Sequence, residues 1–537
     1  MKQRRILLRL PVALFLCSCT GLVHTQATTT DIHAPGDATP EASALACEAP
    51  QVPSPAWYHH AVGYEIFVRS FSDSDGDGIG DLDGLLSRLD YLNDPTGDKD
   101  LGVDLLWLMP IAESPSYHGY DVTDYRHVRK EYGGDQAFDR FISEAHKRGI
   151  RVVIDLVLNH SSSAHPYFQE SASGPDSPRR DWYVWSPVKL DWQRPWGGGQ
   201  TWYQKNGAWY YALFSKDMPD LNWKTPAVFN EMTDVAKAWL GRGVDGFRLD
   251  AVRYLVEEGP GAGQADTNKN HEVLRAFRAA LNATDALLVG EVWASAQVGA
   301  PYFGSSLSDE LPMLFDFDLA DALVQGIRSA RAGLVREALC NRLSLWPAWG
   351  AAGVFLTNHD MVRVATALGD LPPEALRLAA ALLFGMPGTP WIYYGEEIGM
   401  KNGPGDDDRA KRLPMQWDSG PLVGFTTGKP WANPASMDPN VAAQLDDPGS
   451  LLALYRSLIQ VRRSHEALRI GSTRVLGDES LLVLERVTPK ETMLLVFNLS
   501  GEARGFEPPQ GFVPVIPAQA PSGTIEPFGF CYLVASQ

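Results

Sequence analysis

Three short apolar runs in this chain each end in a carboxylate. They are Val244 to Asp250, Leu287 to Glu291 and Val354 to Asp360. A short, nearly continuous apolar run is typical of a strand buried in a parallel sheet. A carboxylate at the C-terminal end of such a strand emerges at the rim that carries catalysis in a (β/α)8 barrel. Helix capping would explain one such acid, but three together, two of them beside Arg248 and His359, indicate acid/base chemistry at a common rim.

Strand-like runs alternate with helix-like segments from Trp57 onward, as a repeated βα unit requires. Amphipathic helical patterns cover residues 136–148 and 228–241. Eight runs have strand character: Tyr64–Arg69, Val103–Met109, Arg151–Leu158, Val244–Asp250, Leu287–Glu291, Met313–Phe317, Gly353–Asn358 and Trp391–Tyr394. The sequence therefore predicts an α/β fold built on a (β/α)8 TIM barrel.

Domain boundaries follow from where this rhythm changes. We expect the barrel to comprise residues 57–158 and 223–465, with its last helix near residues 455–464. Residues 159–222 are rich in Trp, Tyr, Pro and Gly, which predicts an inserted subdomain, domain B, after the third strand. The β-patterned runs within residues 466–537 predict a C-terminal β-sandwich.

A second irregular stretch, residues 401–448, follows the eighth strand. It contains Trp417, Phe425 and Trp431. Aromatic side chains in such a stretch either flank a ligand-binding groove or pack a long loop, and the sequence leaves both alternatives open.

The N-terminus has the pattern of a secretory signal. A basic start is followed by an apolar stretch up to Cys17 that is too short to span a bilayer comfortably. Residues 16–19 (LCSC) resemble the bacterial lipobox, which predicts a signal peptide at residues 1–18, a lipid on Cys19 and a flexible tether over residues 19–56. We therefore expect an extracytoplasmic lipoprotein, with a plain secretory signal cut elsewhere as the alternative.

Charge and cysteine content narrow the partners further. The formal net charge of -18 disfavours nucleic acid and anionic membranes as partners, so membrane contact is expected only through the lipid anchor. Beyond the signal and lipobox, the cysteines are Cys47, Cys340 and Cys531. Two of them could pair in an oxidising compartment, and the sequence does not say which two. We expect a monomer.

Four motifs resemble those of the alpha-amylase family of retaining glycoside hydrolases, and the resemblance extends over essentially the whole chain from Trp57. In order they are residues 155–160 (DLVLNH), 246–250 (GFRLD), 290–293 (GEVW) and 355–360 (FLTNHD). Each falls on an expected barrel strand. The resemblance implies endo-acting hydrolysis of α-1,4-glucosidic bonds in an α-glucan or maltooligosaccharide substrate, with retention at the anomeric carbon.

Retaining hydrolysis needs one carboxylate as nucleophile and another as proton donor. The resemblance assigns Asp250 as nucleophile, Glu291 as general acid/base and Asp360 as the carboxylate that holds the sugar hydroxyls. Arg248 lies two residues before Asp250 and so on the same face of a strand, where its charge would keep the nucleophile ionised. Glu291 must hold a proton near neutral pH, so we predict that desolvation and neighbouring negative charge raise its pKa.

The resemblance also implies residues that bind the sugar. His160 and His359 would hydrogen-bond it in the cleavage subsite, although each could instead be a buried strand-end histidine bonded to backbone. Within residues 117–120 (YHGY), Tyr120 would stack on the sugar ring with the help of His118. Exo-acting alpha-glucosidases carry an aspartate where this chain has Tyr117, which favours an open, endo-acting cleft.

Other features weaken the endo hypothesis. Residues 251–254 lack the Lys-His pair that follows the nucleophile in many amylases, and residues 412–417 (RLPMQW) look glucosidase-like. Residues 218–222 (MPDLN) resemble a group intermediate between amylases and oligoglucosidases. The alternatives are an exo-acting alpha-glucosidase or oligoglucosidase, a glucan transglycosylase and a noncatalytic sugar-binding protein, the last disfavoured because all three carboxylates are present.

An acidic loop at residues 73–81 (DSDGDGIGD) indicates a Ca²⁺ site. The expected ligands are four carboxylates and one backbone carbonyl: Asp73, Asp75, Asp77, Asp81 and Ile79. An acidic surface turn is the alternative, but four acids so close would repel one another without a cation. A second calcium site of the amylase type would use Asn159 and Asp220, and its occupancy stays open.

Overall fold

The computed structural model describes residues 46–537 except 54, 282–284, 307–308, 520–522 and 537. The expected signal peptide, Cys19 and the tether as far as residue 45 lie outside the described residues. Within the described part of the chain, no helix combines the length and apolar character needed to cross a membrane.

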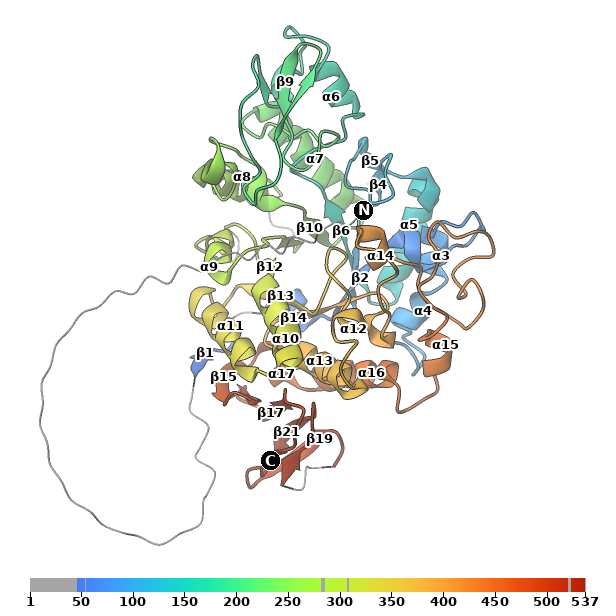
Figure 1. Ribbon diagram of the computed structural model, residues 1–537, viewed down its shortest axis with the longest axis vertical. Helices are drawn as coiled ribbons and strands as arrows, with labels where there is room; N and C mark the ends of the chain where they lie inside the picture. The colour runs from blue at the N-terminus through green and yellow to red at the C-terminus, as the bar shows by residue number, and fades with distance from the viewer. Residues whose placement is uncertain (1–45, 54, 282–284, 307–308, 520–522, 537) are drawn as a thin grey trace, which may run out of the picture. The chain divides into compact units, whose positions relative to one another are not determined.

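Eight parallel strands close into a barrel in which each strand pairs with the next along the chain and the last pairs with the first (Figure 1). They are β2 (Gly63–Ile66), β3 (Leu105–Leu108), β6 (Arg151–Leu156), β10 (Gly246–Leu249), β11 (Leu287–Gly290), β12 (Met313–Phe315), β13 (Ala351–Phe355) and β14 (Thr389–Tyr393). Every strand residue except Arg151 is buried, as expected for parallel strands that are covered on both faces. The predicted TIM barrel is confirmed, and each predicted run contains one strand or most of it.

Helices connect the barrel strands. The longer ones are α5 (Gly134–Lys147), α7 (Pro226–Gly241), α8 (Asn268–Ala280), α10 (Phe317–Ser329), α11 (Ala332–Leu345), α13 (Pro373–Gly385) and α16 (Leu451–Ser464). Two connections contain only short helices. Strands β2 and β3 are joined by α2 (Val68–Phe71), α3 (Leu82–Leu86) and α4 (Leu89–Leu92). Strands β11 and β12 are joined by α9 (Ala296–Gly299) and the 3-10 turn η5 (Ala300–Phe303). The last barrel helix starts at Leu451, where the Ser450 side chain accepts a hydrogen bond from the Ala453 N–H.

The chain between β6 and α7 forms a small antiparallel sheet of its own. Its strands are β7 (Trp185–Ser186), β8 (Trp202–Lys205) and β9 (Ala208–Tyr211), preceded by helix α6 (Pro166–Ser171). A β-bridge between His160 and Asp220 joins the beginning and the end of this segment. Both ends of the segment therefore lie next to the rim of the barrel at β6.

The C-terminal domain is an antiparallel sheet with the strand order β1-β15-β16-β17-β21-β19. The strands are β1 (Cys47–Ala49), β15 (Ser472–Gly477), β16 (Leu481–Val487), β17 (Thr492–Asn498), β21 (Phe530–Ala535) and β19 (Phe512–Ile516). A second, two-stranded sheet of β18 (Arg504–Gly505) and β20 (Thr524–Ile525) contributes Ile525, which packs with Leu494 and Leu533 of the larger sheet. The second layer of this domain is thus much smaller than the first.

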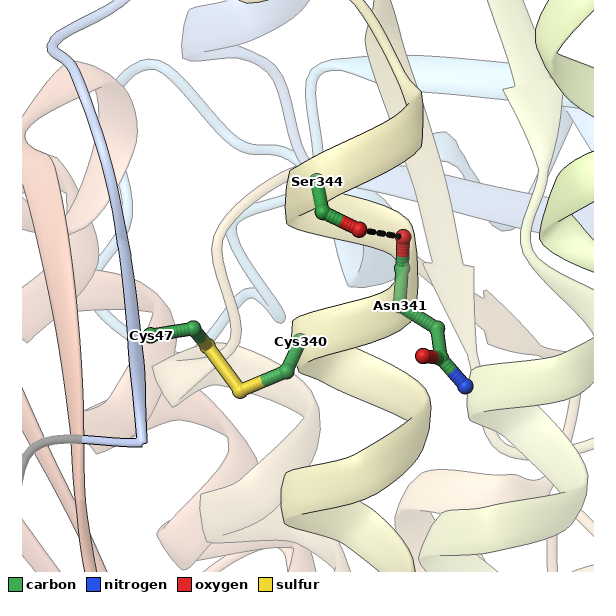
Figure 2. The surroundings of a disulfide bond; sticks show 4 residues. All are labelled: Cys47, Cys340, Asn341 and Ser344. Carbon is green, nitrogen blue, oxygen red and sulfur yellow. Dashed lines mark hydrogen bonds between the residues drawn. A yellow bond between two sulfur atoms is a disulfide. The ribbon is translucent and has the colours of Figure 1, made fainter. Parts of the chain in front are cut away.

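Strand β1 corrects the expected tether. Cys47 lies opposite Val475 of β15 and forms a disulfide with Cys340 of α11, so β1, blue in Figure 1, belongs to the red C-terminal sheet. Figure 2 shows Cys340 on the side of α11 that faces β1, with Ser344 donating a hydrogen bond to the Asn341 carbonyl (2.9 Å) in the same helix. The prediction of a flexible tether as far as residue 56 is wrong from Cys47 onward, because this backbone has sheet partners and a covalent link. Cys531 remains a buried thiol.

Candidate active site

The three expected catalytic carboxylates lie at the C-terminal ends of barrel strands. Asp250 directly follows β10 and Glu291 directly follows β11, and the pairing of Leu249 with Gly290 brings these two acids to the same level of the barrel. Asp360 follows β13 after a short turn. All three line a single cavity of about 690 Å³, so acids that are far apart in the sequence share one site.

The guanidinium of Arg248 contacts two of these acids, Asp250 and Glu291, and also Asp155. It is fully buried, and its Nη1 lies 2.7 Å from Oδ1 of Asp250 and 2.7 Å from Oδ1 of Asp155. Its Nη2 lies 2.9 Å from Oε2 of Glu291. One cation is therefore shared among three carboxylates, and it holds the expected nucleophile and the expected proton donor on the same planar group.

Burial and the charges around Arg248 together determine the pKa values of Asp250 and Glu291. Burial raises the pKa of Asp250 to about 6, because the opposing effect of Arg248 is offset by desolvation and by the charges of Asp155 and Asp360. The expectation that Arg248 keeps the nucleophile ionised is therefore incomplete. Burial, with further contributions from Asp250 and Asp360, also raises the pKa of Glu291, which is the direction that a proton donor needs.

Ala251, directly after Asp250, has a backbone conformation that non-glycine residues seldom adopt. Its φ is 50°, in the left-handed region. In this conformation its N–H donates a hydrogen bond of 2.9 Å to Oε2 of Glu291. Such local strain is typical of sites where the surrounding structure fixes a functional group, and here it orients the Glu291 carboxylate.

Asp360 lies between two cationic side chains. Its Oδ1 is 2.7 Å from Nη2 of Arg412 and its Oδ2 is 3.2 Å from Nε2 of His359. Although burial raises the pKa of Asp360, His359 and Arg412 lower it overall, so this acid stays ionised. The Nδ1 of His359 lies 2.5 Å from Oε1 of Glu65 on β2, and although burial lowers the pKa of His359, Asp360 and Glu65 raise it overall.

Tyr120 stacks on two histidine rings. Its ring centre lies 6.0 Å from that of His118 and 5.7 Å from that of His359, and its hydroxyl is 2.7 Å from Nε2 of His359. His160 is buried, and burial lowers its pKa to about 4, so the ring is neutral. His118, Tyr120 and His160 line the cavity. The expected sugar-binding residues Arg248 and His359 are not among the lining residues and contact the lining acids Asp250 and Asp360.

Further lining residues come from loops, and the sequence motifs assign none of them a role in the site: Trp196, Phe214, Met218, Arg253, Tyr254, Trp293, Asp408 and Arg412. Trp196 and Trp293 are 52% and 49% exposed, and Trp293 stacks on Phe317 at 4.8 Å. Exposed indole faces beside the carboxylates of this cavity offer stacking surfaces for sugar rings. The only sequence signal for them was the aromatic richness of the insertion and the GEVW motif.

Tyr117, the residue on which the endo hypothesis rests, does not line the cavity. Its ring stacks on Trp431 at 5.5 Å with an interplanar angle of 22°, and the Arg409 guanidinium lies 4.9 Å from its centre. The space beside Tyr117 is thus filled by the segment that follows β14. Trp417 and Phe425 of the same segment are buried, which favours loop packing over a groove flank for these two residues.

The acidic loop brings three of its four aspartates together. One carboxylate oxygen from each of Asp73, Asp75 and Asp81 lies within 4.8 Å of the others, and Asp77 is not part of this group. Although burial raises the pKa of Asp73, hydrogen bonds from Thr426 and from the backbone of the loop lower it overall. Hard oxygen donors in this arrangement fit Ca²⁺.

The second expected calcium site has its two residues in contact. Nδ2 of Asn159 donates a hydrogen bond of 3.0 Å to Oδ2 of Asp220, whose Oδ1 accepts from the Leu213 N–H at 2.8 Å. Oδ1 of Asn159 is buried and has no hydrogen-bond partner among the described residues. The pair thus connects the end of β6 to the insertion.

Known proteins resemble this chain in sequence and fold. The model of the alpha amylase catalytic domain matches residues 65–471. Alpha-amylase 3 of Dictyoglomus thermophilum is 38% identical over 455 residues, covering 83% of this chain and 85% of that protein. The oligo-1,6-glucosidase of Parageobacillus thermoglucosidasius is 34% identical over 518 residues, covering 81% and 91%. The crystal structure of the trehalulose synthase MutB from Pseudomonas mesoacidophila has a TM-score of 0.81 at 31% identity, over 90% of this chain and 100% of that chain.

The barrel and its ring of strand-end carboxylates define an enzyme that acts on glycosidic bonds. Together with the match over residues 65–471, they place the protein in a single family. The chain belongs to the alpha-amylase family of glycoside hydrolases.

Proposed function

We propose that this enzyme is a retaining α-glucosidase that hydrolyses short α-linked glucose oligosaccharides near a chain end. Asp250 attacks the anomeric carbon while Glu291 protonates the departing glycosidic oxygen, and the C–O bond breaks to leave a glycosyl ester on Asp250. Glu291 then takes a proton from water as the water attacks the anomeric carbon, and the bond from that carbon to Asp250 breaks to release the carboxylate. Arg248 stabilises the negative charge of Asp250 before attack and after release.

The observation that carries the chain-end proposal is the placement of Arg412. This buried side chain is ion-paired with Asp360, which would hold the sugar hydroxyls, and it lines the cavity together with Asp408. The stack of Tyr117 on Trp431 fills the space alongside. A sugar unit beyond the one at Asp360 would therefore meet a charged wall, and the relatives named for oligosaccharides support the same substrate class.

Endo-acting hydrolysis of starch is the second candidate function. It is favoured by the tyrosine at position 117, where exo-acting glucosidases are expected to carry an aspartate, and by the similarity to Alpha-amylase 3. Transfer of the glycosyl group to a sugar instead of water would use the same first half-reaction.

Product analysis distinguishes these functions. Maltoheptaose labelled at its reducing end should lose glucose or short units from the other end, and soluble starch should keep its iodine staining while these products accumulate. Rapid loss of staining would contradict the chain-end proposal in favour of endo hydrolysis, and products longer than the substrate would indicate transfer. Arg412→Ala should lengthen the released products, whereas Arg328→Ala on the outer surface of α10 should leave the product pattern unchanged.

We also propose that the loop at residues 73–81 binds Ca²⁺ and that the enzyme is an extracytoplasmic monomer anchored by a lipid on Cys19. The convergence of Asp73, Asp75 and Asp81 supports the first proposal. The Cys47–Cys340 disulfide supports the second, because disulfides persist in oxidising compartments. Mass spectrometry of the native N-terminus should find an acylated Cys19, and an unmodified N-terminus at another residue would contradict the anchor.

A further inference from the structure

A second cavity, of about 110 Å³, lies at the opposite end of the barrel from the active site. Its walls include Gly350 and Gly388, which precede β13 and β14, Arg342 of α11 and Arg486 of β16. Ala49, at the end of β1, and Pro50 and Val52 just beyond it also line the cavity. The cavity thus lies where the N-terminal strand, the barrel floor and the C-terminal sheet meet.

The lining carries positive charge and no acidic residue. Its ionisable members are the cationic Arg342, Arg469 and Arg486 and the neutral His59, whose pKa burial lowers to about 4. Arg342 and Arg486 are 3% and 1% exposed. Within the described part of the chain, the one carboxylate within 4.0 Å of any of these groups is Asp316, 3.6 Å from Nε of Arg342. Arg469 and Arg486 therefore have no ion-pair partner among the described residues.

Several buried N–H groups at this cavity have no hydrogen-bond partner among the described residues. They are Nε of Arg486, Nε of Arg469 and Nε2 of His59. The remaining nitrogens of Arg486 reach only backbone carbonyls, those of Gly385 at 3.4 Å and Gly471 at 3.3 Å. A buried cation whose donors are unpaired destabilises the fold, so these groups need an acceptor that the described residues do not supply.

Neighbouring charge makes the imbalance larger. Arg462 is also fully buried, and its hydrogen bonds go to backbone carbonyls, including Gly388 at 2.6 Å. Burial, together with Arg462 and Arg342, lowers the pKa of Arg486 to about 9. The arginines thus repel one another in a region of low dielectric, where a negative charge would be held strongly.

We propose that this cavity binds a small inorganic anion, a halide or a tetrahedral oxyanion, between Arg486, Arg342 and His59. The anion accepts the unpaired N–H groups and stabilises the attachment of β1 and its disulfide to the barrel floor. The volume is well below the roughly 300 Å³ at which pockets for organic ligands begin, so a sugar is not the ligand. The site is remote from the catalytic carboxylates and acts on stability.

Thermal unfolding in different salts tests the proposal. At equal ionic strength, sodium chloride or sodium sulfate should raise the Tm of the purified enzyme saturably by a few degrees above its value with the bulky anion of MOPS. Arg486→Met, which keeps the side-chain length and removes the charge, should abolish this saturable rise. Arg474→Met, at an exposed arginine of β15 that pairs with Glu485, should retain it.

Crystals soaked in sodium bromide give an independent readout on the unmodified enzyme. We expect an anomalous peak within hydrogen-bond distance of Arg486, and absence of that peak together with the absence of a sulfate in sulfate-grown crystals would overturn the proposal. Equal stabilisation by all three anions, or a saturable rise that persists in Arg486→Met, would also overturn it. If Arg486→Met does not fold, the soaked crystals decide.

Discussion

The guanidinium of Arg248 lies 2.7 Å from the carboxylate of Asp250, two residues further along the chain at the end of β10. The alternation of side chains along a strand places both on the same face. Because burial nevertheless raises the pKa of Asp250 to about 6, this expected nucleophile depends on Arg248 to remain ionised near neutral pH.

Replacing Arg248 by Gln should reduce kcat/KM at pH 7 by at least about 100-fold, since three buried carboxylates then lose their shared cation. The pKa of Asp250 should rise further, so the acid limb of the pH profile should move to higher pH. Steady-state kinetics across pH measures both effects. Arg140→Gln, which removes an exposed ion pair to Asp83, should change neither, and an unshifted acid limb in Arg248→Gln would refute the electrostatic role.

The pH dependence of kcat/KM should be bell-shaped. Asp250 must be deprotonated to attack, so activity should fall as pH drops below about 6. Glu291 must be protonated to donate, so activity should fall again above its raised pKa. Glu291→Gln should lower kcat by about 10²- to 10⁴-fold and remove the basic limb while sugar binding persists. A basic limb that survives this substitution would assign the donor role elsewhere.

Chelation should destabilise the enzyme if the loop at residues 73–81 binds Ca²⁺. EDTA should lower the Tm and added Ca²⁺ should restore it, because a ligand that binds only the folded state stabilises by mass action. Asp73→Asn should remove the dependence on EDTA, while Asp191→Asn at an exposed position of the insertion should preserve it. A Tm that is insensitive to EDTA in the unmodified enzyme would contradict the proposed site.

Loss of the Cys47–Cys340 disulfide should destabilise the folded state. The bond closes a loop of 293 residues, and Cys340→Ser should lower the free energy of unfolding by about 2–4 kcal/mol, measured by urea denaturation. Reductant should produce the same loss in the unmodified enzyme and in Cys531→Ala, because Cys531 is a buried thiol outside the bond. Reductant without effect on either would show that β1 is held by strand pairing alone.

The barrel and the positions of the three expected catalytic carboxylates at its rim could be predicted, because each strand is a short apolar run and each acid directly follows or nearly follows one. The strand pattern did not predict the roles of Glu65 and Asp155. A single acid within an apolar strand does not indicate which residue of another strand it contacts. Their contacts with His359 and Arg248 arise only when the barrel closes. Local patterns thus predicted the positions on each strand but not the pairs between strands.

The walls of the cleft were less accessible to prediction. Arg412 was noticeable within a glucosidase-like motif, but its ion pair with Asp360 depends on how the long segment after β14 folds back over the rim. Tyr117 predicted an open passage, and Trp431, more than three hundred residues away in the sequence, fills the adjacent space. Contacts between distant loops depend on tertiary packing and cannot be predicted from the composition of either loop.

Strand β1 also bears on how a sugar would reach the site. It fixes the first described residues beside β15, below the barrel, whereas the three strand-end acids follow the upper ends of the strands. Within the described residues, the N-terminal strand and the cleft thus lie at opposite ends of the barrel, so this strand leaves the entrance for a sugar unobstructed.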